Sequence, residues 1–402
     1  MSWNISKLGE ECKIFSGNSI NAKTKENLYT NVEGIPYIAT KDITYDGNIN
    51  YLNGISIPED HQDKFRKAKS ECVFICAEGG SAGRKIAFSD TECFFVNKLF
   101  CLEGGSNLLP KYIYYYLRSE AFQIQFKNAL TGLIGGVSLS KIRLFDITYP
   151  SLSVQKQIIE KLDTVFTDID KAISTTVKNI ENTEALFLKH QNEILSSNAR
   201  NWQTKKLQDI CEHITDGTHQ TPKYFDDGYI FLSSKNVKNK KIDWENIKYI
   251  DESQHLAMQK RLSPKKGDIL LAKNGTTGVG AIVDRDLIFD IYVSLALIRS
   301  KGDVIPEYLL EVLNSLDTKK QFNERLKGTG VPNLHLKEIR EVTVSYPISM
   351  EDQNNIVSKI NQFEKHIDVL KGNYENKLSL LSALKSSLLN QAFSGELTKD
   401  AA

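Results

Sequence analysis

The sequence of 402 residues lacks several features that would assign it to a common class of protein. It has no apolar run long enough to cross a lipid bilayer, so we expect no membrane role. Residues 1–8 lack the basic start and the apolar stretch of a secretory signal, which predicts a cytoplasmic protein. Five of its six cysteines fall within residues 12–101, and this uneven spread excludes a disulfide framework and predicts reduced thiols.

The sequence also lacks the ligand spacing of a metal site. Cys72 and Cys76 are not spaced as a zinc pair, and the second half of the chain has no counterparts for them or for Cys93 and Cys101. Buried cysteines in strands explain these residues better than metal ligands do. The histidines lack paired ligand spacing, so we assign none of them to a metal or to base catalysis.

Two motifs of catalysis are missing as well. An adenine methyltransferase needs an Asn/Asp-Pro-Pro-aromatic loop to hold the flipped base, and this chain contains no Pro-Pro pair. Residues 79–85 look superficially like a phosphate-binding loop, but Arg84 stands where that loop requires its second glycine. We therefore expect no catalytic residue, no bound nucleotide and no cofactor in this chain.

The chain has little net charge, because 51 lysine and arginine residues are balanced by 50 aspartate and glutamate residues. A dedicated nucleic-acid binder often carries a strong basic excess, so the whole-chain balance argues against nucleic acid. Basic clusters are nevertheless present at residues 64–69, 235–241 and 260–266. A solvated lysine-rich face explains each cluster at least as well as a binding surface does.

What the sequence does contain is an internal repeat, in which the second half retraces the first at an offset of 194 to 199 residues. In each copy a buried strand is predicted to run into a glycine-rich turn, and a proline begins a helix farther along. The chain is therefore predicted to contain two copies of one domain. The matched positions include Trp3 and Trp202, Cys12 and Cys211, Lys41 and Lys235, residues 73–83 and 269–278, and Pro110 and Pro306.

Each copy is followed by a long helix with a coiled-coil seam. After the Tyr-Pro pairs at 149–150 and 346–347, apolar residues fall on alternating four- and three-residue steps. The first stripe is weaker, because Thr176, Thr183 and His190 replace apolar residues in it. Since such helices are not stable alone, we expect the two stripes to bury each other in an antiparallel pair. The predicted seam residues are Ile159, Phe166, Ile173, Ile180 and Phe187 in the first helix and Ile360, Ile367, Tyr374, Leu381 and Leu388 in the second.

We therefore predict an α+β protein in four parts, with domains at 1–150 and 198–347 and helical segments at 151–197 and 348–402. The two repeated domains are expected at opposite ends of the antiparallel coiled-coil helices, related by approximate two-fold symmetry. Duplex DNA has the same symmetry, and its major groove returns to one face about every 34–36 Å. Two domains on a spacer would read two separated half-sites, and because the domains differ, the two-part site is expected to be asymmetric.

The glycine-rich turns are the leading candidates for contacts with double-stranded DNA. Glycine lets the backbone approach a phosphate, and nearby hydroxyl, amide and basic groups can donate hydrogen bonds to phosphates or base edges. A tight turn between strands explains the glycines alone, and an ion pair or turn cap explains the residues after the earlier strand equally well. The candidates are Gly79, Gly80, Ser81, Gly83, Arg84 and Lys85 in the first turn, Asn274, Gly275, Thr276, Thr277 and Gly278 in the second, and Lys41, Lys235 and Asn236 after the earlier strands.

Several segments have a pattern that is known from one family. They are the domain opening at 202–207, the Thr-Asp-Gly-Thr-His segment at 215–219, the two glycine-rich turns, and above all the ending at 384–397, Leu-Lys-Ser-Ser-Leu-Leu-Asn-Gln-Ala-Phe-Ser-Gly-Glu-Leu. Over essentially its full length the chain resembles the specificity subunit of type I restriction-modification enzymes. The first copy departs from that ending, because residues 196–199 read Ser-Ser-Asn-Ala.

The resemblance implies a protein that performs no chemistry itself. Two copies of a DNA methyltransferase (modification) subunit with S-adenosylmethionine would methylate an adenine in each half-site, and a restriction subunit would add translocation and cleavage with ATP and Mg²⁺. The family docks its methyltransferase subunits on the helices, which here implies the outward faces of 151–197 and 348–393. Two alternatives stay open. One is a specificity subunit without a restriction partner, which serves methylation alone or another restriction type, and the other is a coiled-coil scaffold whose end domains bind proteins.

Overall fold

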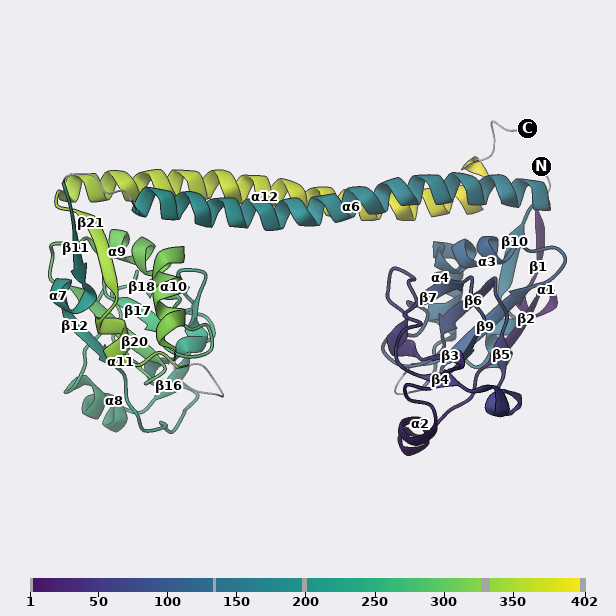
Figure 1. Ribbon diagram of the computed structural model, residues 1–402, viewed down its shortest axis with the longest axis horizontal. Coiled ribbons are helices and arrows are strands. Elements are labelled where there is room, and N and C mark those ends of the chain that lie inside the picture. The colour runs from purple at the N-terminus through teal and green to yellow at the C-terminus, as the bar shows by residue number, and fades with distance from the viewer. Residues whose placement is uncertain (1–2, 133–134, 197–200, 327–332, 398–402) are drawn as a thin grey trace. The chain divides into compact units, whose positions relative to one another are not determined.

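The structure is a computed structural model that describes residues 3–132, 135–196, 201–326 and 333–397 (Figure 1). The chain forms two compact units, one made of Met1–Thr176 with Asn376–Ala402 and the other of Val177–Glu375. Each unit holds one α+β domain and one part of each of two long helices, α6 (Leu152–Leu195) and α12 (Met350–Phe393). Within the described residues, no helix combines the length and the apolar character that crossing a lipid bilayer requires.

The domain of the first unit contains two four-stranded sheets, with the orders β2-β9-β6-β7 and β4-β3-β8-β5, and a separate pair of β1 with β10. Strand β6 is buried along its whole length and leads into the glycine-rich turn, as the sequence predicts. The strands are β1 (Asn4–Lys7), β2 (Cys12–Ser16), β3 (Ile35–Ile38), β4 (Ser56–Ile57), β5 (Lys67–Ala68), β6 (Cys72–Cys76), β7 (Ile86–Ser89), β8 (Cys93–Phe95), β9 (Leu99–Gly104) and β10 (Asp146–Tyr149). The helices are α1 (Leu8–Glu11), α2 (Ala22–Leu28), α3 (Pro110–Arg118), α4 (Glu120–Ala129), α5 (Leu139–Arg143) and the 3-10 helices η1 (Thr40–Asp42) and η2 (Glu59–Lys64).

The domain of the second unit repeats this topology. Its four-stranded sheet, β12-β20-β17-β18, corresponds to β2-β9-β6-β7, and the parallel pair of β13 with β19 corresponds to that of β3 with β8. The strands are β11 (Trp202–Lys206), β12 (Cys211–Asp216), β13 (Tyr229–Leu232), β14 (Val237–Lys238), β15 (Lys241–Ile242), β16 (Lys248–Ile250), β17 (Ile269–Ala272), β18 (Gly280–Ile282), β19 (Phe289–Ile291), β20 (Leu295–Ser300) and β21 (Thr343–Pro347). The helices are α7 (Leu207–Ile210), η3 (Ser234–Asn236), α8 (Glu252–Gln259), α9 (Pro306–Leu313), α10 (Leu316–Arg325) and α11 (Leu336–Arg340). The predicted α+β class with two repeated domains is confirmed.

The repeated Pro-x-Tyr motif fixes the helix that packs on each main sheet. A proline begins both α3 and α9, where its missing N–H has no intrahelical partner to lose. Two residues later Tyr112 and Tyr308 are fully buried, and their hydroxyls donate to the carbonyl oxygens of Thr148 (2.8 Å) and Ser345 (2.9 Å). These bonds attach α3 to β10 and α9 to β21, the strands that lead into the long helices.

A repeated glutamine fastens the beginning of each long helix to its domain. The side chain of Gln155 is completely buried, donates to the carbonyl oxygen of Asn107 at 2.8 Å and accepts from the backbone N–H of Leu109 at 3.0 Å. Gln353 is equally buried and makes the matching bonds to Asp303 (2.9 Å) and Ile305 (2.8 Å). In each glutamine the side-chain N–H donates and the side-chain oxygen accepts a hydrogen bond from the domain. These bonds hold the start of each helix at one place on its domain.

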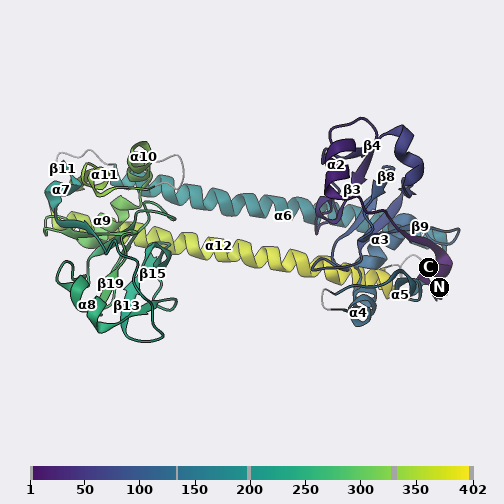
Figure 2. The same ribbon diagram turned by 90° about the horizontal axis from the view of Figure 1, so that it is seen from below.

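In each unit a segment of α6 runs alongside a segment of α12 (Figure 2). In the first unit, Phe166 near the start of α6 belongs to the same apolar cluster as Leu389 near the end of α12. In the second unit, Phe187 near the end of α6 stacks on Phe363 near the start of α12, with ring centroids 6.1 Å apart. The start of each helix meets the end of the other, so the pair is antiparallel. Of the predicted seam residues, four are buried (Phe166, Phe187, Ile360 and Ile367) and six are partly buried (Ile159, Ile173, Ile180, Tyr374, Leu381 and Leu388).

The two threonines of the weaker stripe are buried and form hydrogen bonds within their own helix. Thr176 and Thr183 are 0% and 5% exposed, and each hydroxyl donates at 2.7 Å to the carbonyl oxygen four residues earlier in α6. This local bond satisfies a buried hydroxyl inside a helix. His190 instead packs its ring against Phe363, with centroids 4.5 Å apart.

The six cysteines, all within the described residues, are free and buried. Burial raises the pKa of the Cys12 and Cys211 thiols to about 12. They therefore remain protonated at neutral pH and act as small apolar residues of the core.

Candidate nucleic-acid interface

The glycine-rich turn of the first domain joins β6 to β7 and has two kinds of glycine. Gly83 has a φ of +71°, and a Cβ atom there would lie 2.5 Å from the ring of Phe126. Gly79 has a φ of +83°, but a Cβ at Gly79 or Gly80 would meet no atom within 4 Å. Packing against Phe126 thus requires a glycine at position 83, whereas Gly79 and Gly80 have open space where a side chain would project.

The turn of the second domain, between β17 and β18, repeats this division. A Cβ at Gly278 would lie 2.9 Å from the ring of Phe322, at a φ of +83°. At Gly275, which has a φ of +74°, the only atom within 4 Å is the Ser234 hydroxyl oxygen at 3.8 Å. The tight-turn interpretation therefore accounts for Gly83 and Gly278, and the open backbone lies at Gly79, Gly80 and Gly275.

The structure brings the first turn next to η1, which carries Lys41. The ammonium of Lys85 donates to the carbonyl oxygen of Thr40 at 2.8 Å, and Lys41 itself is exposed. Asp42 caps the 3-10 helix from inside, because its buried carboxylate accepts from the backbone N–H of Ala39 at 2.8 Å. Two segments about 40 residues apart in the sequence thus form one surface.

Tyr45 joins this surface, although the sequence analysis did not single it out. Its side chain is 54% exposed, its hydroxyl lies 3.5 Å from the Ser81 hydroxyl, and the charged groups of Arg84 and Lys85 each lie 5.4 Å from its ring. The hydrogen bond with Ser81 and then the charge of Arg84 lower the pKa of the Tyr45 hydroxyl. An exposed aromatic ring between two cations has the make-up of a phosphate- and base-contacting surface.

In the second domain the corresponding residues divide between the surface and the interior. Lys235 is exposed on η3, whereas Asn236 is only 5% exposed. The Asn236 amide accepts from the backbone N–H of Ser233 at 3.0 Å and donates to the carbonyl oxygens of Asp243 and Asn246 at 3.2 and 3.0 Å. Of the two interpretations of Asn236, the turn cap therefore matches its position, and the residue holds η3 in place for Lys235.

The second turn is fastened to η3 and to the strand that follows it. The Ser234 hydroxyl donates to the side-chain oxygen of Asn274 at 3.1 Å, and the Thr276 hydroxyl donates to the carbonyl oxygen of Val237 at 3.3 Å. Thr277 is partly buried beside them. The candidate residues of the second domain therefore occupy one continuous region, as those of the first domain do.

A cavity of about 300 Å³ opens beside Lys235 and Asn274. It is also lined by Tyr224, Lys248 and Tyr292, and the ammonium of Lys248 lies 3.8 Å from the ring centroid of Tyr224. The sequence analysis missed these three residues. The sequence pattern that could have indicated this region is an aromatic residue next to a lysine in a loop, as in Lys223-Tyr224.

Comparisons with known proteins identify the family and the fold of the chain. The model of the type I restriction modification DNA specificity domain matches the sequence twice, at residues 1–182 and at residues 199–379. The chain belongs to this family. The EcoKI specificity subunit of Escherichia coli strain K12 is 23% identical over 428 residues, covering 98% of this chain and 89% of that protein. The MjaVIII specificity subunit of Methanocaldococcus jannaschii is 22% identical over 418 residues, covering 98% and 93%.

Two solved structures share the fold. A structure that concerns complex assembly and conformational transition of the type I R-M system contains a chain with a TM-score of 0.76 and 17% identity, and 98% of both chains is covered. The HsdS subunit from Thermoanaerobacter tengcongensis has a TM-score of 0.56 and 18% identity, with 98% of this chain and 97% of that chain covered. The predicted resemblance to type I specificity subunits is confirmed.

In the second specificity domain, a buried ion pair lies next to the turn residue Asn274. Lys273, which directly precedes Asn274, donates to Asp216 at 2.6 Å, and both side chains are about 5% exposed. Burial alone would raise the pKa of Asp216, but the hydrogen bond and charge of Lys273 outweigh it and hold that pKa below its usual range. Arg261 also donates to Asp216, at 3.0 Å. The pair therefore supports the strand that presents Asn274.

None of the specificity-domain residues that the structure describes forms a group of three or more histidine, cysteine, aspartate or glutamate side chains able to hold a metal ion.

Proposed function

We propose that each specificity domain of this chain reads one half of an asymmetric, two-part site in double-stranded DNA. The observation that carries the proposal is the repeated surface made by a glycine-rich turn and a lysine-bearing 3-10 helix. In both domains this surface combines open backbone with side chains that donate hydrogen bonds, which are the groups that contact phosphates and base edges. We propose that the two reading domains comprise residues 1–150 and 198–347, each followed by one helical segment.

The two half-sites are expected to differ, because the two surfaces present different sets of side chains. Arg84, Ser81 and Tyr45 gather on the first surface. Asn274 and Lys235 line the cavity on the second. Arginine suits the paired acceptors of guanine, and asparagine suits the acceptor and donor of adenine. Each surface thus favours its own bases.

We further propose that α6 and α12 set the distance between the half-sites and dock two copies of a modification subunit. Both helices run from one compact unit into the other, so their length relates the two domains along the chain. Each also carries exposed apolar side chains, which support protein docking on their outward faces. Examples are Val177 and Leu186 on α6 and Val369, Leu380 and Leu384 on α12.

In this proposal the chain itself performs no catalysis and binds no cofactor. S-adenosylmethionine would be held by the modification subunits, and ATP and Mg²⁺ by a restriction subunit. The chain would select the DNA sequence at which the partner subunits act.

The proposal is tested by sequencing N6-methyladenine in DNA from cells that carry this gene with a neighbouring methyltransferase gene. An asymmetric two-part motif should appear only when this chain is present. No motif, with both proteins present and soluble, would favour a scaffold that binds proteins through its end domains. A motif without any restriction of unmodified DNA would favour a subunit that serves methylation alone.

Two matched variants then assign the half-sites. We expect Arg84→Ala to relax the base preference of one half-site and Asn274→Ala to relax that of the other. In each variant, the preference for the correct base over a wrong base at one position should fall about tenfold. Lys13→Ala is the control, because Lys13 is exposed on β2, with its ammonium 3.3 Å from Glu103 and 4.9 Å from the ring centroid of Phe15. Relaxation of both half-sites by one variant would contradict the assignment of one domain to one half-site.

A further inference from the structure

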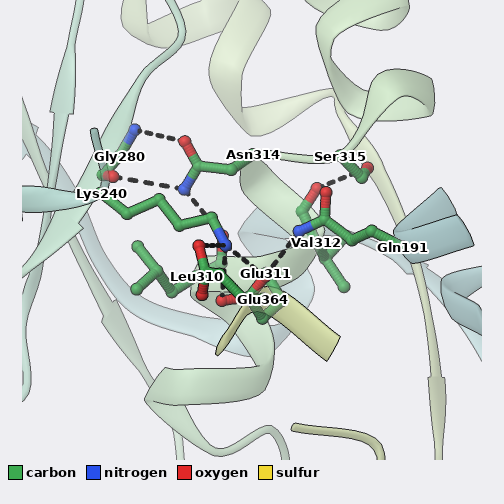
Figure 3. Close-up of polar contacts among 9 residues, drawn as sticks. All are labelled: Gln191, Lys240, Gly280, Leu310, Glu311, Val312, Asn314, Ser315 and Glu364. Atoms are coloured by element: carbon green, nitrogen blue, oxygen red, sulfur yellow. Dashed lines mark hydrogen bonds and ion pairs between the residues drawn. The ribbon is translucent and has the colours of Figure 1, made fainter. Parts of the chain in front are cut away.

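In the second unit, Lys240 of the hairpin between β14 and β15 lies in a polar cluster with residues of α6, α9 and α12 (Figure 3). Its centre is Glu311 of α9, which is only 4% exposed. The ammonium of Lys240 lies 3.1 and 2.8 Å from the two carboxylate oxygens of Glu311 and 3.3 Å from a carboxylate oxygen of Glu364 on α12. From the opposite side, the amide of Gln191 on α6 donates to Glu311 at 2.5 Å. One cation thus connects three helices through two carboxylates.

Lys240 comes from the hairpin of β14 and β15, at a position where lysine is unfavourable. The register pairs Lys238 with Lys241, so the loop consists of Asn239 and Lys240 alone. Their φ angles of +49° and +60° are those of a type I′ turn, in which asparagine followed by glycine is the preferred pair. A residue with a Cβ in this conformation carries backbone strain. A lysine at a position that disfavours it indicates that its side chain has a task in this fold.

The hairpin directly follows the residues that form the second recognition surface. Asn236, which caps η3 beneath Lys235, is the residue before β14. The first residue of β14, Val237, accepts the hydrogen bond of Thr276 from the glycine-rich turn. The position of the hairpin therefore sets the positions of both Lys235 and Thr276 relative to the helices.

The cluster holds this position because its members depend on one another. A carboxylate as buried as that of Glu311 is costly without a cation, and the apolar surroundings strengthen its attraction to Lys240. Lys240 also lies 5.2 Å from the ring centroid of Phe187 on α6, so its ammonium is enclosed on that side too. Displacing the hairpin would separate a buried ion pair, which resists small movements.

We propose that Lys240 and Glu311 are positioning residues, which fix the second recognition surface to α6 and α12 and thereby fix the spacing at which the second half-site is read. This inference rests on the proposed reading of a two-part DNA site. It adds that the spacing depends on the polar cluster as well as on the length of the helices.

The test uses the double variant Lys240→Gly with Glu311→Gln in the full chain, together with the methyltransferase partner. Glycine creates the preferred Asn-Gly turn, and glutamine removes the buried charge, so the fold is retained while the ionic link is lost. The measurement compares the fraction of adenines methylated at two kinds of site. It is the fraction at sites whose spacer is one base pair too long or too short, divided by the fraction at sites with the correct spacer. We expect this ratio to rise about tenfold, with the base preference of the first half-site unchanged.

Two further variants make the test decisive. Glu364→Gln breaks only the link to α12, at a side chain that is 38% exposed, and should raise the ratio by a smaller factor without unfolding the chain. Lys238→Ala is the control, because Lys238 lies on the same hairpin but is 62% exposed and has its nearest carboxylate, that of Asp243, at 4.0 Å. This control should give the wild-type ratio.

The outcomes separate the inference from the function on which it rests. If the wild-type chain gives no two-part motif, the proposed function is wrong. If it gives the motif and the double variant keeps the wild-type spacing ratio, the positioning role is overturned. Should the double variant prove insoluble, Glu364→Gln decides in the same way, because an unchanged ratio in that variant overturns the role and a raised ratio supports it.

Discussion

The two specificity domains use different side chains to attach the same helix to the long helices. In the first domain, Lys111 and Tyr115 of α3 both hold Asp163 of α6, at 2.6 and 2.5 Å. In the second domain, Glu311 of α9 occupies the place of Tyr115 and accepts hydrogen bonds from Gln191 of α6 at 2.5 Å and from Lys240 of the hairpin at 2.8 Å. Burial and the neighbouring Asp163 carboxylate raise the pKa of Tyr115, so that it remains a hydrogen-bond donor. One position thus serves the attachment as a donor in one domain and as an acceptor in the other.

In this duplicated protein, side chains that bind backbone groups are constrained differently from side chains that bind other side chains. Gln155 and Gln353 are identical because both bind the backbone, whose donors and acceptors recur wherever the fold recurs. Tyr115 and Glu311 bind side chains, so each needs to match only its own partner. Backbone-directed groups therefore preserve the fold, whereas pairs of side chains can diverge between the copies, as they do on the two recognition surfaces.

The largest effect that would test this comparison is expected next to the second recognition surface. Lys273→Met leaves the buried carboxylate of Asp216 without its closest cation, and we expect it to lower the free energy of unfolding by about 3 kcal/mol. In the first domain the structurally equivalent residue is Ala77, because the Ala77 and Lys273 amides donate to the carbonyl oxygens of Lys98 and Ser294, respectively. The measurement is a urea titration followed by circular dichroism, which reports on both units and therefore also measures a variant of the first domain.

The control for this variant is Lys98→Met in the first domain. Lys98 and Glu78 form an exposed ion pair, so its loss should change the free energy of unfolding by no more than about 0.5 kcal/mol. The lowered pKa of Asp216 adds a pH test. Its stabilising effect is present above the unfolded pKa of about 3.9 and is lost as the pH falls through the lower folded value. A loss below about 1 kcal/mol in Lys273→Met would mean that Arg261 suffices as the cation for Asp216.

Features with local causes could be read from the sequence. The proline that begins α3, the buried strand β6 and the glycine-rich turn after it follow from residues that are close together in the chain. The antiparallel helix pair follows from the apolar period of α6 and α12. The seam positions occupied by Thr176 and Thr183 looked like weaknesses, and the structure gives the reason why they are tolerated, since each hydroxyl bonds within its own helix.

Features made by distant side chains could not be read in this way. Lys240 and Glu311 are 71 residues apart, and a lysine in a basic stretch gives no indication that it is partly buried against a glutamate. Asn236 and Lys235 are adjacent, yet one points into the domain and the other into solvent, which depends on the backbone of η3. Tyr45 reaches Ser81 only because the fold places η1 beside the turn.

A smaller effect is expected from the packing glycines of the two turns. Gly83→Ala should lower the free energy of unfolding by about 2 kcal/mol, because alanine adopts a positive φ poorly and its Cβ would press on Phe126. Gly278→Ala should cost about 1 kcal/mol, since the Phe322 ring lies farther away, at 2.9 Å against 2.5 Å. Gly80→Ala, with open space around it, should be neutral within about 0.5 kcal/mol. Differential scanning calorimetry measures all three, and equal losses at Gly80 and Gly83 would contradict the division into open and packing glycines.

A weak effect is expected where the first domain meets α6. Asp163→Asn keeps the shape of the side chain but removes the charge that Lys111 binds and weakens the acceptor for Tyr115. Because Asp163 is about a third exposed, we expect a loss of only about 1 kcal/mol in the free energy of unfolding, measured by circular dichroism in urea. High salt should weaken the wild-type chain toward the variant, since a partly exposed ion pair is screened. If Asp163→Asn lowers the free energy of unfolding as much as Lys273→Met does, the attachment of the first domain depends on a charge as strongly as the interior of the second domain does. The two domains would then differ in which polar pairs they use but not in how much those pairs contribute to stability.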